Sequence, residues 1–181
     1  MKRLLLLLLL LLAFPLAAQE PAPAPAPNTP EANKEVVRRY LQILGGGALD
    51  QLDQVLGPDF VDRTPGAAPN VYGPEAIRQS QRKARDLFQD IHYAVDDLIA
   101  EGDRVAARYT VRATRKGNGA AGLPVQVIGV TFFRIADGKI REAWIVNDQI
   151  ELFRQLGFTI RPPQTETPKP PKPSSKPPSK T

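Results

Sequence analysis

Asp148 is the residue whose type and position most clearly allow chemistry in this sequence. It lies where an alternating apolar segment, typical of a strand, passes into the helix-like segment QIELFRQLG. A carboxylate at such a place can take up a proton inside a pocket and return it. It can equally cap the helix, because Glu151 follows three residues later, at the spacing of a capping box. The residues by themselves leave both roles open.

Apolar residues that could surround a substrate occur in the neighbouring alternating segments. Tyr109 and Phe133 would supply pocket walls. Trp144 lies four residues before Asp148 and therefore on the same face of an extended strand. Apolar walls strengthen a carboxylate as a base, because they remove water from its charged form. Trp144 also has a simpler interpretation as a core residue, which is the usual place of a buried aromatic side chain.

Two polar residues, Thr131 and Arg63, are candidates for binding a substrate oxygen. A threonine hydroxyl can donate a hydrogen bond to an enolate oxygen, although it carries no charge. Arginine can bind a carboxylate or an enolate oxygen through its guanidinium group. Both residues have simpler interpretations, since threonine is common in strands and Arg63 can pair with Asp59 or Asp62.

The sequence contains no cysteine and a single histidine, His92. It therefore has no disulfide, no thiol nucleophile and few of the usual ligands for zinc or iron. His92 alternates with Ile91 and Tyr93 and is expected to point away from their apolar face. We predict no metal site and no cofactor, and we assign no catalytic role to His92.

Both ends of the chain differ in composition from its middle. Residues 1–18 join two basic residues to a run of leucines, the pattern of a secretory signal peptide, which predicts a secreted or periplasmic protein. An uncleaved signal that anchors the chain in a membrane is the alternative. Residues 19–30 form a Pro-Ala linker of extended polyproline type. Residues 162–181 form a Lys-Pro tail with too little apolar surface to fold, so we predict disorder, with weak contact to an anionic envelope as the alternative.

The net charge of +5 comes from these ends. Residues 19–161 contain 18 basic and 18 acidic side chains. A balanced domain lacks the basic surface that nucleic-acid-binding proteins present. We therefore predict no nucleic-acid partner.

The domain itself, residues 31–161, is long enough for one hydrophobic core. A first helix is predicted to follow Thr29 as N-cap, with Pro30 in its first turn, and to end at the three glycines 45–47. A shorter helix (48–55), an irregular proline-rich stretch (57–74) and a third helix (74–88) follow. Alternation then predicts four strands and a closing helix, at 90–100, 104–115, 125–135, 139–148 and 149–157.

Helices followed by an antiparallel meander indicate an α+β fold. Some of the strands are apolar on both faces, so the sheet must be covered on each side. A curved antiparallel sheet wrapped around the N-terminal helices, with an interior pocket, satisfies that requirement.

Three motifs connect the domain to a known family: EGDRVA followed by arginine, FRIADGKI.E.W...D, and the closing L..QLG. Over about residues 31–158 the chain resembles the SnoaL-like polyketide cyclases, often called ester cyclases, whose cone fold belongs to the nuclear-transport-factor-like superfamily. The resemblance implies that Asp148, the aspartate of W...D, is the acid/base that moves a proton at a carbon activated by carbonyls. Many family members carry a histidine or another strong polar group where this chain has Thr131, and a histidine where it has Arg63.

From the residues and the resemblance together we predict acid–base cyclisation or isomerisation of a small apolar carbonyl compound. Asp148 would be the acid/base, with Trp144, Tyr109 and Phe133 as walls and Thr131 or Arg63 as oxygen ligands. The alternative is a non-catalytic ligand-binding or dimerisation module of the cell envelope. The resemblance also implies a homodimer, formed through the open face of the sheet.

Overall fold

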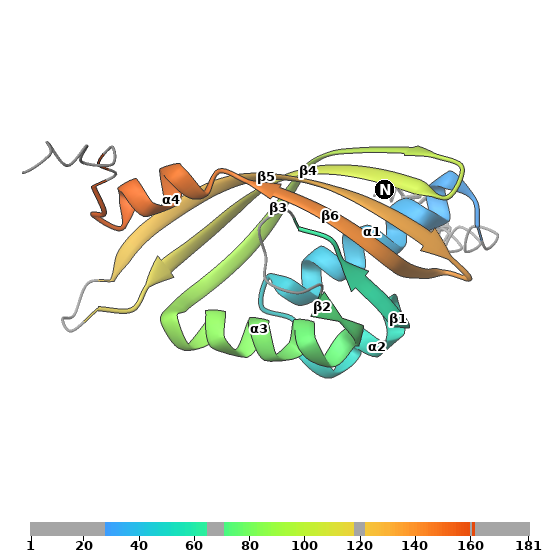
Figure 1. The fold of residues 1–181 in the computed structure, drawn as a ribbon, viewed down its shortest axis with the longest axis horizontal. Helices are drawn as coiled ribbons and strands as arrows, with labels where there is room; N and C mark the ends of the chain where they lie inside the picture. Colours follow the sequence, from blue (N-terminus) through green and yellow to red (C-terminus); the bar gives the residue numbers. More distant parts are fainter. Residues whose placement is uncertain (1–27, 65–70, 118–121, 160, 162–181) are drawn as a thin grey trace, which may run out of the picture.

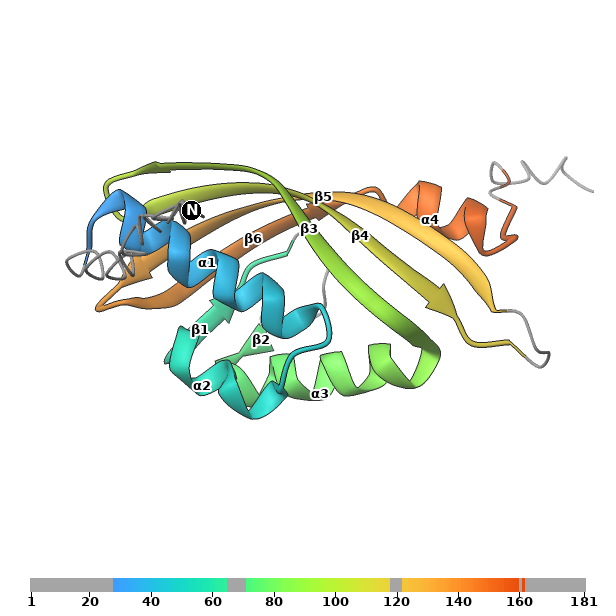
Figure 2. The ribbon, with the colours of Figure 1, turned by 180° about the vertical axis from the view of Figure 1, so that it is seen from behind.

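The computed structural model describes residues 28–64, 71–117, 122–159 and 161. The predicted signal peptide, nearly all of the Pro-Ala linker and the Lys-Pro tail lie outside these residues. A six-stranded sheet in the order β2-β1-β6-β5-β4-β3 curves over the helices α1 and α3 (Figures 1 and 2). Its strands are β1 (Leu56–Asp62), β2 (Val71–Tyr72), β3 (Phe88–Glu101), β4 (Arg104–Arg115), β5 (Leu123–Ala136) and β6 (Lys139–Asn147). The predicted α+β fold with a curved sheet is confirmed.

Helix α1 begins where the sequence places its cap. In α1 (Pro30–Leu44) the amide of Ala32 donates to Thr29 Oγ1 at 3.2 Å, and Pro30 occupies the first turn. The chain then forms a short 3₁₀ turn and α2 (Leu52–Val55), followed later by α3 (Gly73–Leu87) and α4 (Gln149–Gln155). None of the described helices combines the length and the apolar character needed to cross a lipid bilayer.

Strands β3 to β6 form the predicted antiparallel meander. The turn between β5 and β6 is built on Asp137 and Gly138, both with positive φ, as the Asp-Gly signal predicts. Beyond the end of β6, helix α4 takes the place of a neighbouring strand beside β5. There the side chain of Gln155 accepts from the amide of Gln126 at 2.8 Å and donates to its carbonyl at 2.9 Å. One glutamine thus satisfies both backbone groups of an otherwise open edge position.

The sequence predicted an irregular stretch over residues 57–74, but part of this stretch forms strands. Strand β1 pairs in parallel with β6, and β2 pairs with β1. The register of β1 against β6 shifts between Leu56 and Val61, and Pro58 lies in that interruption. A proline has no amide hydrogen to donate to the hydrogen bonds between strands. The sequence therefore argued against a strand here, whereas the structure forms one whose pairing is interrupted at the proline.

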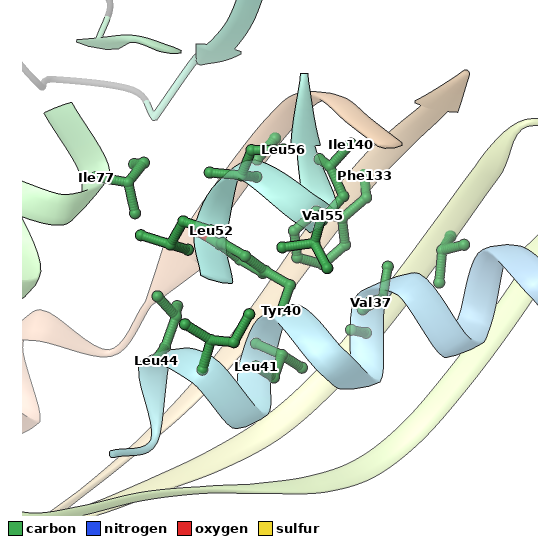
Figure 3. Close-up of a cluster of buried hydrophobic side chains, with 14 of the residues drawn as sticks. Val37, Tyr40, Leu41, Leu44, Leu52, Val55, Leu56, Ile77, Phe133 and Ile140 are labelled. Carbon is green, nitrogen blue, oxygen red and sulfur yellow. The ribbon is translucent and has the colours of Figure 1, made fainter. Parts of the chain in front are cut away.

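The core lies between α1, the start of β1 and the concave face of the sheet. Figure 3 shows this cluster, with side chains of α1 facing those of α2, β1 and the sheet. Tyr40 meets Phe133 edge to face, with ring centroids 5.7 Å apart. The apolar spacing of Ile77, Ala84 and Leu87 predicts that all three point inward from the third helix. For Leu87 this is wrong: it is 60% exposed, because the helix ends there and the chain turns into β3.

Candidate active site

A partly enclosed cavity of about 160 Å³ lies under the curved sheet. Side chains from α1, α3, β1 and each strand from β3 to β6 line it, which places it at the centre of the cone. Most are apolar, with polar atoms concentrated on a few residues: Asp62, Ser80, Gln81, Tyr109, Thr131 and Asn147. An apolar cavity with a few convergent polar groups is the usual form of a small-molecule site. We call it the inner cavity.

A hydrogen-bond chain crosses the roof of the inner cavity. The Tyr109 hydroxyl lies 2.9 Å from Thr131 Oγ1 and donates to Asn147 Oδ1 at 3.3 Å. Tyr109, Gly129 and Asn147 are direct partners across β4, β5 and β6. A Cβ atom on Gly129 would lie 2.3 Å from Asn147 Oδ1 and 2.5 Å from Tyr109 Cε2. Gly129 therefore provides the space in which the tyrosine and the asparagine meet.

Three tyrosines surround the cavity as protonated hydroxyl groups. Burial is the main cause that raises the pKa of Tyr40 well above its usual value, with Tyr93 and Asp62 adding to the effect. Burial also raises the pKa of Tyr93 and of Tyr109, although the Thr131 hydrogen bond acts in the opposite direction at Tyr109. All three hydroxyls therefore remain potential hydrogen-bond donors throughout the physiological pH range.

Asp62 supplies the only carboxylate among the described residues that line the inner cavity. It ends β1 two residues after the fully buried Phe60, and the period of two turns both toward the core. Its Oδ1 accepts from the Thr64 amide at 2.9 Å and from the Thr64 hydroxyl. These bonds within the turn hold the carboxylate in place. The sequence had suggested Asp62 only as a partner for Arg63, yet its alternation with Phe60 was the available signal.

Three of the predicted substrate-binding residues line the inner cavity. Tyr109, Thr131 and Phe133 are all buried there. Thr131 is 1% exposed, and its hydroxyl binds Tyr109, so it does more than fill a strand position. The structure thus places the two predicted pocket walls, Tyr109 and Phe133, beside the predicted oxygen ligand, Thr131.

Trp144 and Arg63 lie on the opposite face of the sheet and are absent from the inner cavity. Trp144 is the direct partner of Phe132 on β5, whose side chain is 55% exposed. The Arg63 guanidinium carbon lies 5.9 Å from the centre of the Trp144 ring, and its Nε donates to Glu142 at 2.9 Å. The predicted pairing of Arg63 with Asp59 or Asp62 is therefore wrong, because Asp59 pairs with Arg141 and Asp62 points to the inner face.

Asp148 is exposed and caps α4. Its Oδ1 accepts from the amide of Glu151 at 2.9 Å, as the capping pattern predicts. Its carboxylate borders an open surface hollow that also includes Thr64 and Ile150, whereas the residue lining the inner cavity is its neighbour Asn147. Sequence reasoning missed Asn147, although alternation with Asp148 assigns it to the opposite face.

A second, more apolar pocket of about 250 Å³ adjoins the inner cavity. It lies between α3, the far ends of β3, β4 and β5, and helix α4. Gln81, Tyr93 and Asn147 line both spaces and form the partition between them. We call this space the outer pocket. Among the described residues no group of three or more metal-binding side chains occurs.

The family model of the SnoaL-like polyketide cyclases matches residues 34–156, which is more than half of the chain. The chain belongs to this family, as its motifs suggested, and its curved sheet and helices are those of the family's cone fold. Family membership supports cyclase- or isomerase-type chemistry in general terms. Among curated proteins, none matches the sequence significantly.

Solved structures of similar proteins agree with this assignment. IdmH from Streptomyces antibioticus is 25% identical, with a TM-score of 0.61 over 70% of this chain and 99% of its own. TsrD from Streptomyces laurentii is 28% identical, with a TM-score of 0.61 over 71% and 97%. AclR from Streptomyces galilaeus is 25% identical, with a TM-score of 0.63 over 75% and 91%. The likeness therefore spans nearly the whole length of these proteins.

Proposed function

We propose that the chain is an acid–base cyclase or isomerase that acts on a small, mostly apolar carbonyl compound in the inner cavity. The observation that carries the proposal is the meeting of one carboxylate, Asp62, with a set of hydroxyl and amide groups in a cavity otherwise walled by apolar side chains. Membership of the SnoaL-like family supports the same class of reaction.

In the proposed reaction Asp62 takes a proton from the carbon next to a substrate carbonyl, and the electron pair of that C–H bond forms an enolate. When the substrate binds, Tyr109 or Thr131 turns its hydroxyl hydrogen from its partner in the hydrogen-bond chain to the negative oxygen and stabilises it, an effect that is strong where water is excluded. In an isomerisation the Asp62 proton returns to a different carbon. In a cyclisation the enolate carbon attacks a second carbonyl, and the proton goes to the new alkoxide. Either route leaves the composition of the substrate unchanged.

Asp148 is the competing acid/base, since it occupies the position to which the family resemblance assigns that role. Its cap bond uses Oδ1, and the second carboxylate oxygen could serve a substrate bound in the hollow beside Thr64. We favour Asp62 because it faces a more enclosed space with hydroxyl donors at hand, where a carboxylate and its substrate are screened from water.

Two further expectations from the sequence remain proposals. Export through residues 1–18 would place the protein outside the cytoplasm, and a homodimer would use the open face of the sheet. A non-catalytic envelope module that only binds its ligand is the alternative function, and the experiment below separates it from an enzyme.

Deuterium exchange tests the chemistry without knowledge of the natural substrate. The full chain is incubated in deuterated water with three neutral compounds of equal chain length: a methyl ketone, a β-keto ester and a β-diketone. Mass spectrometry then measures deuterium uptake at the carbon next to the carbonyl, above the rate without protein. Asp62→Asn and Asp148→Asn are matched variants, because asparagine can keep the turn at Thr64 and the cap at Glu151 while losing basicity.

We expect Asp62→Asn to reduce the exchange rate at least about a hundredfold, within the range that general-base catalysis usually contributes, and Asp148→Asn to change it less than about threefold. The reverse pattern would assign the base to Asp148. If wild-type protein binds these ketones and accelerates the exchange of none, the catalytic proposal is wrong and the binding module stands.

A further inference from the structure

We propose that the ligand is an uncharged molecule of two parts, with a carbonyl or hydroxyl end in the inner cavity and a flexible aliphatic part in the outer pocket. The inference names the ligand class of the same site. It rests on the proposed function only for the direction in which the ligand enters, carbonyl end first.

The absence of cationic side chains carries the first half of the inference. Among the described residues that line the two spaces there is no lysine, arginine or histidine, and the one acidic side chain is that of Asp62. A carboxylate, phosphate or sulfate brought into this site would lose water, gain no cationic partner and meet another negative charge. Each of these effects disfavours an anion. An acid or a phosphate-bearing carrier is thereby excluded from the buried part of the ligand.

The lining of the outer pocket carries the second half. Its floor is aliphatic, with Val111, Ala113, Val125 and Val127 from β4 and β5, and Leu152 of α4 closes one side. These strand side chains are small and carry no polar atom that could fix a substituent, and Gln149 adds one amide group elsewhere in the lining. At the inner end the partition residues Gln81 and Asn147 present amide groups, which suit the change from hydrocarbon to oxygen along the ligand.

The dependence of affinity on chain length tests the arrangement. Equilibrium dialysis measures the dissociation constants of pentan-2-one, heptan-2-one, decan-2-one and decanoate for the full chain. Burying one methylene group strengthens binding by about fourfold, so we expect a steady increase of that order per carbon along the ketones. Decanoate at neutral pH should bind at least about tenfold more weakly than decan-2-one, because it must lose its hydration beside Asp62.

Val127→Trp fills the outer pocket, and Ile128→Trp is its matched control on the opposite, exposed face of the same strand. In Val127→Trp the gain per methylene should fall below about twofold, while pentan-2-one still binds as before. Ile128→Trp should leave the whole series unchanged. Ala113→Leu, a smaller filling of the same pocket, gives an intermediate slope and decides the question if Val127→Trp does not fold.

Affinity independent of chain length, or decanoate binding as tightly as decan-2-one, would overturn the inference. Its failure is distinguishable from failure of the proposed function. Deuterium exchange on short ketones without a chain-length effect would refute the ligand class and keep the chemistry. A chain-length effect without exchange would keep the ligand class and refute the chemistry.

Discussion

The two faces of strands β4, β5 and β6 are built from alternate residues of the same segments, yet they serve different purposes. On the inner face the cross-strand row Tyr109–Gly129–Asn147 converges on the inner cavity. On the outer face the row Ala106–Phe132–Trp144 extends to Ile99 of β3, and both Phe132 and Ile99 are more than half exposed. The inner face thus buries polar groups among apolar side chains, whereas the outer face exposes apolar side chains.

The charged residues follow the same division. On the outer face they pair with one another near the surface, as Glu142 does with Arg63 at 2.9 Å and with Arg134. Hydrogen bonds from these arginines lower the pKa of Glu142, and the bond from Arg134 has the larger effect. On the inner side Asp62 has no cationic partner among the described residues. A carboxylate without an arginine partner remains available as a base. This favours the inner face over the outer face as the location of a catalytic site.

The largest expected contrast between the faces is in stability. Phe133→Ala should lower the free energy of unfolding by about 3–5 kcal/mol, because it removes a fully buried ring that contacts Tyr40. Phe132→Ala, one residue earlier on the same strand, should cost less than about 1 kcal/mol because its ring is exposed. Denaturant unfolding of both variants measures the difference. Because the proposed homodimer would cover Phe132, both variants are compared at a protein concentration that keeps the chain monomeric, and equal losses there would refute the contrast between the faces.

Gly129→Ala is expected to be next in size. The added Cβ would overlap both Tyr109 and Asn147, and overpacking of this kind costs about 1–3 kcal/mol. It should also break the bond from Tyr109 to Asn147 and so weaken ketone binding. Gly117→Ala is the control, since a Cβ there meets no atom within 4 Å. A Gly129→Ala protein with wild-type stability and wild-type ketone affinity would show that the row does not need its glycine.

Alkaline pH should destabilise the protein through the inner face. The folded-state pKa values of Tyr40, Tyr93 and Tyr109 are raised above the usual value near 10. Their contribution to stability is therefore complete below about pH 10 and is lost as the pH rises from there toward the folded-state values. In that range each tyrosine removes about 1.4 kcal/mol per pH unit. Unfolding measured between pH 8 and 11.5 should show a shallower loss in Tyr93→Phe than in wild type, and parallel curves would refute the assignment.

The smallest effect on the stability of the monomer is expected for Phe132→Glu, which changes a position exposed in the single chain and should shift the free energy of unfolding of the monomer by only about 0.5 kcal/mol. The same variant tests the predicted homodimer, because a charge in the middle of the outer row would oppose association through that face. Sedimentation velocity should then show a dimer for wild type and a monomer for Phe132→Glu. A monomeric wild type would refute the predicted homodimer, and a dimeric Phe132→Glu would place its contact elsewhere.

Much of the architecture was predictable because its signals are local. Thr29 and Asp148 cap helices through backbone amides three residues away, and Asp137–Gly138 make a turn by their own backbone preference. Strand β1 escaped prediction because its ladder is interrupted at a proline and its partner, β6, lies about eighty residues further along the chain.

The candidate site was only half predictable. Alternation correctly grouped Trp144 with Asp148, and it separated Asn147 from both, yet it could not tell which group faces inward. In strands that are apolar on both sides the two faces look alike in the sequence.

The sequence by itself determined the family, the order of most elements and which residues share a face, because motifs, caps and alternation act between near neighbours. Only the tertiary structure decided which face closes over the cavity. That choice depends on the packing of α1 and α3 against one side of the sheet, a contact between distant segments that no local pattern records. It turned Tyr109, Thr131, Phe133 and Asp62 inward, and left Trp144 and Arg63 outside.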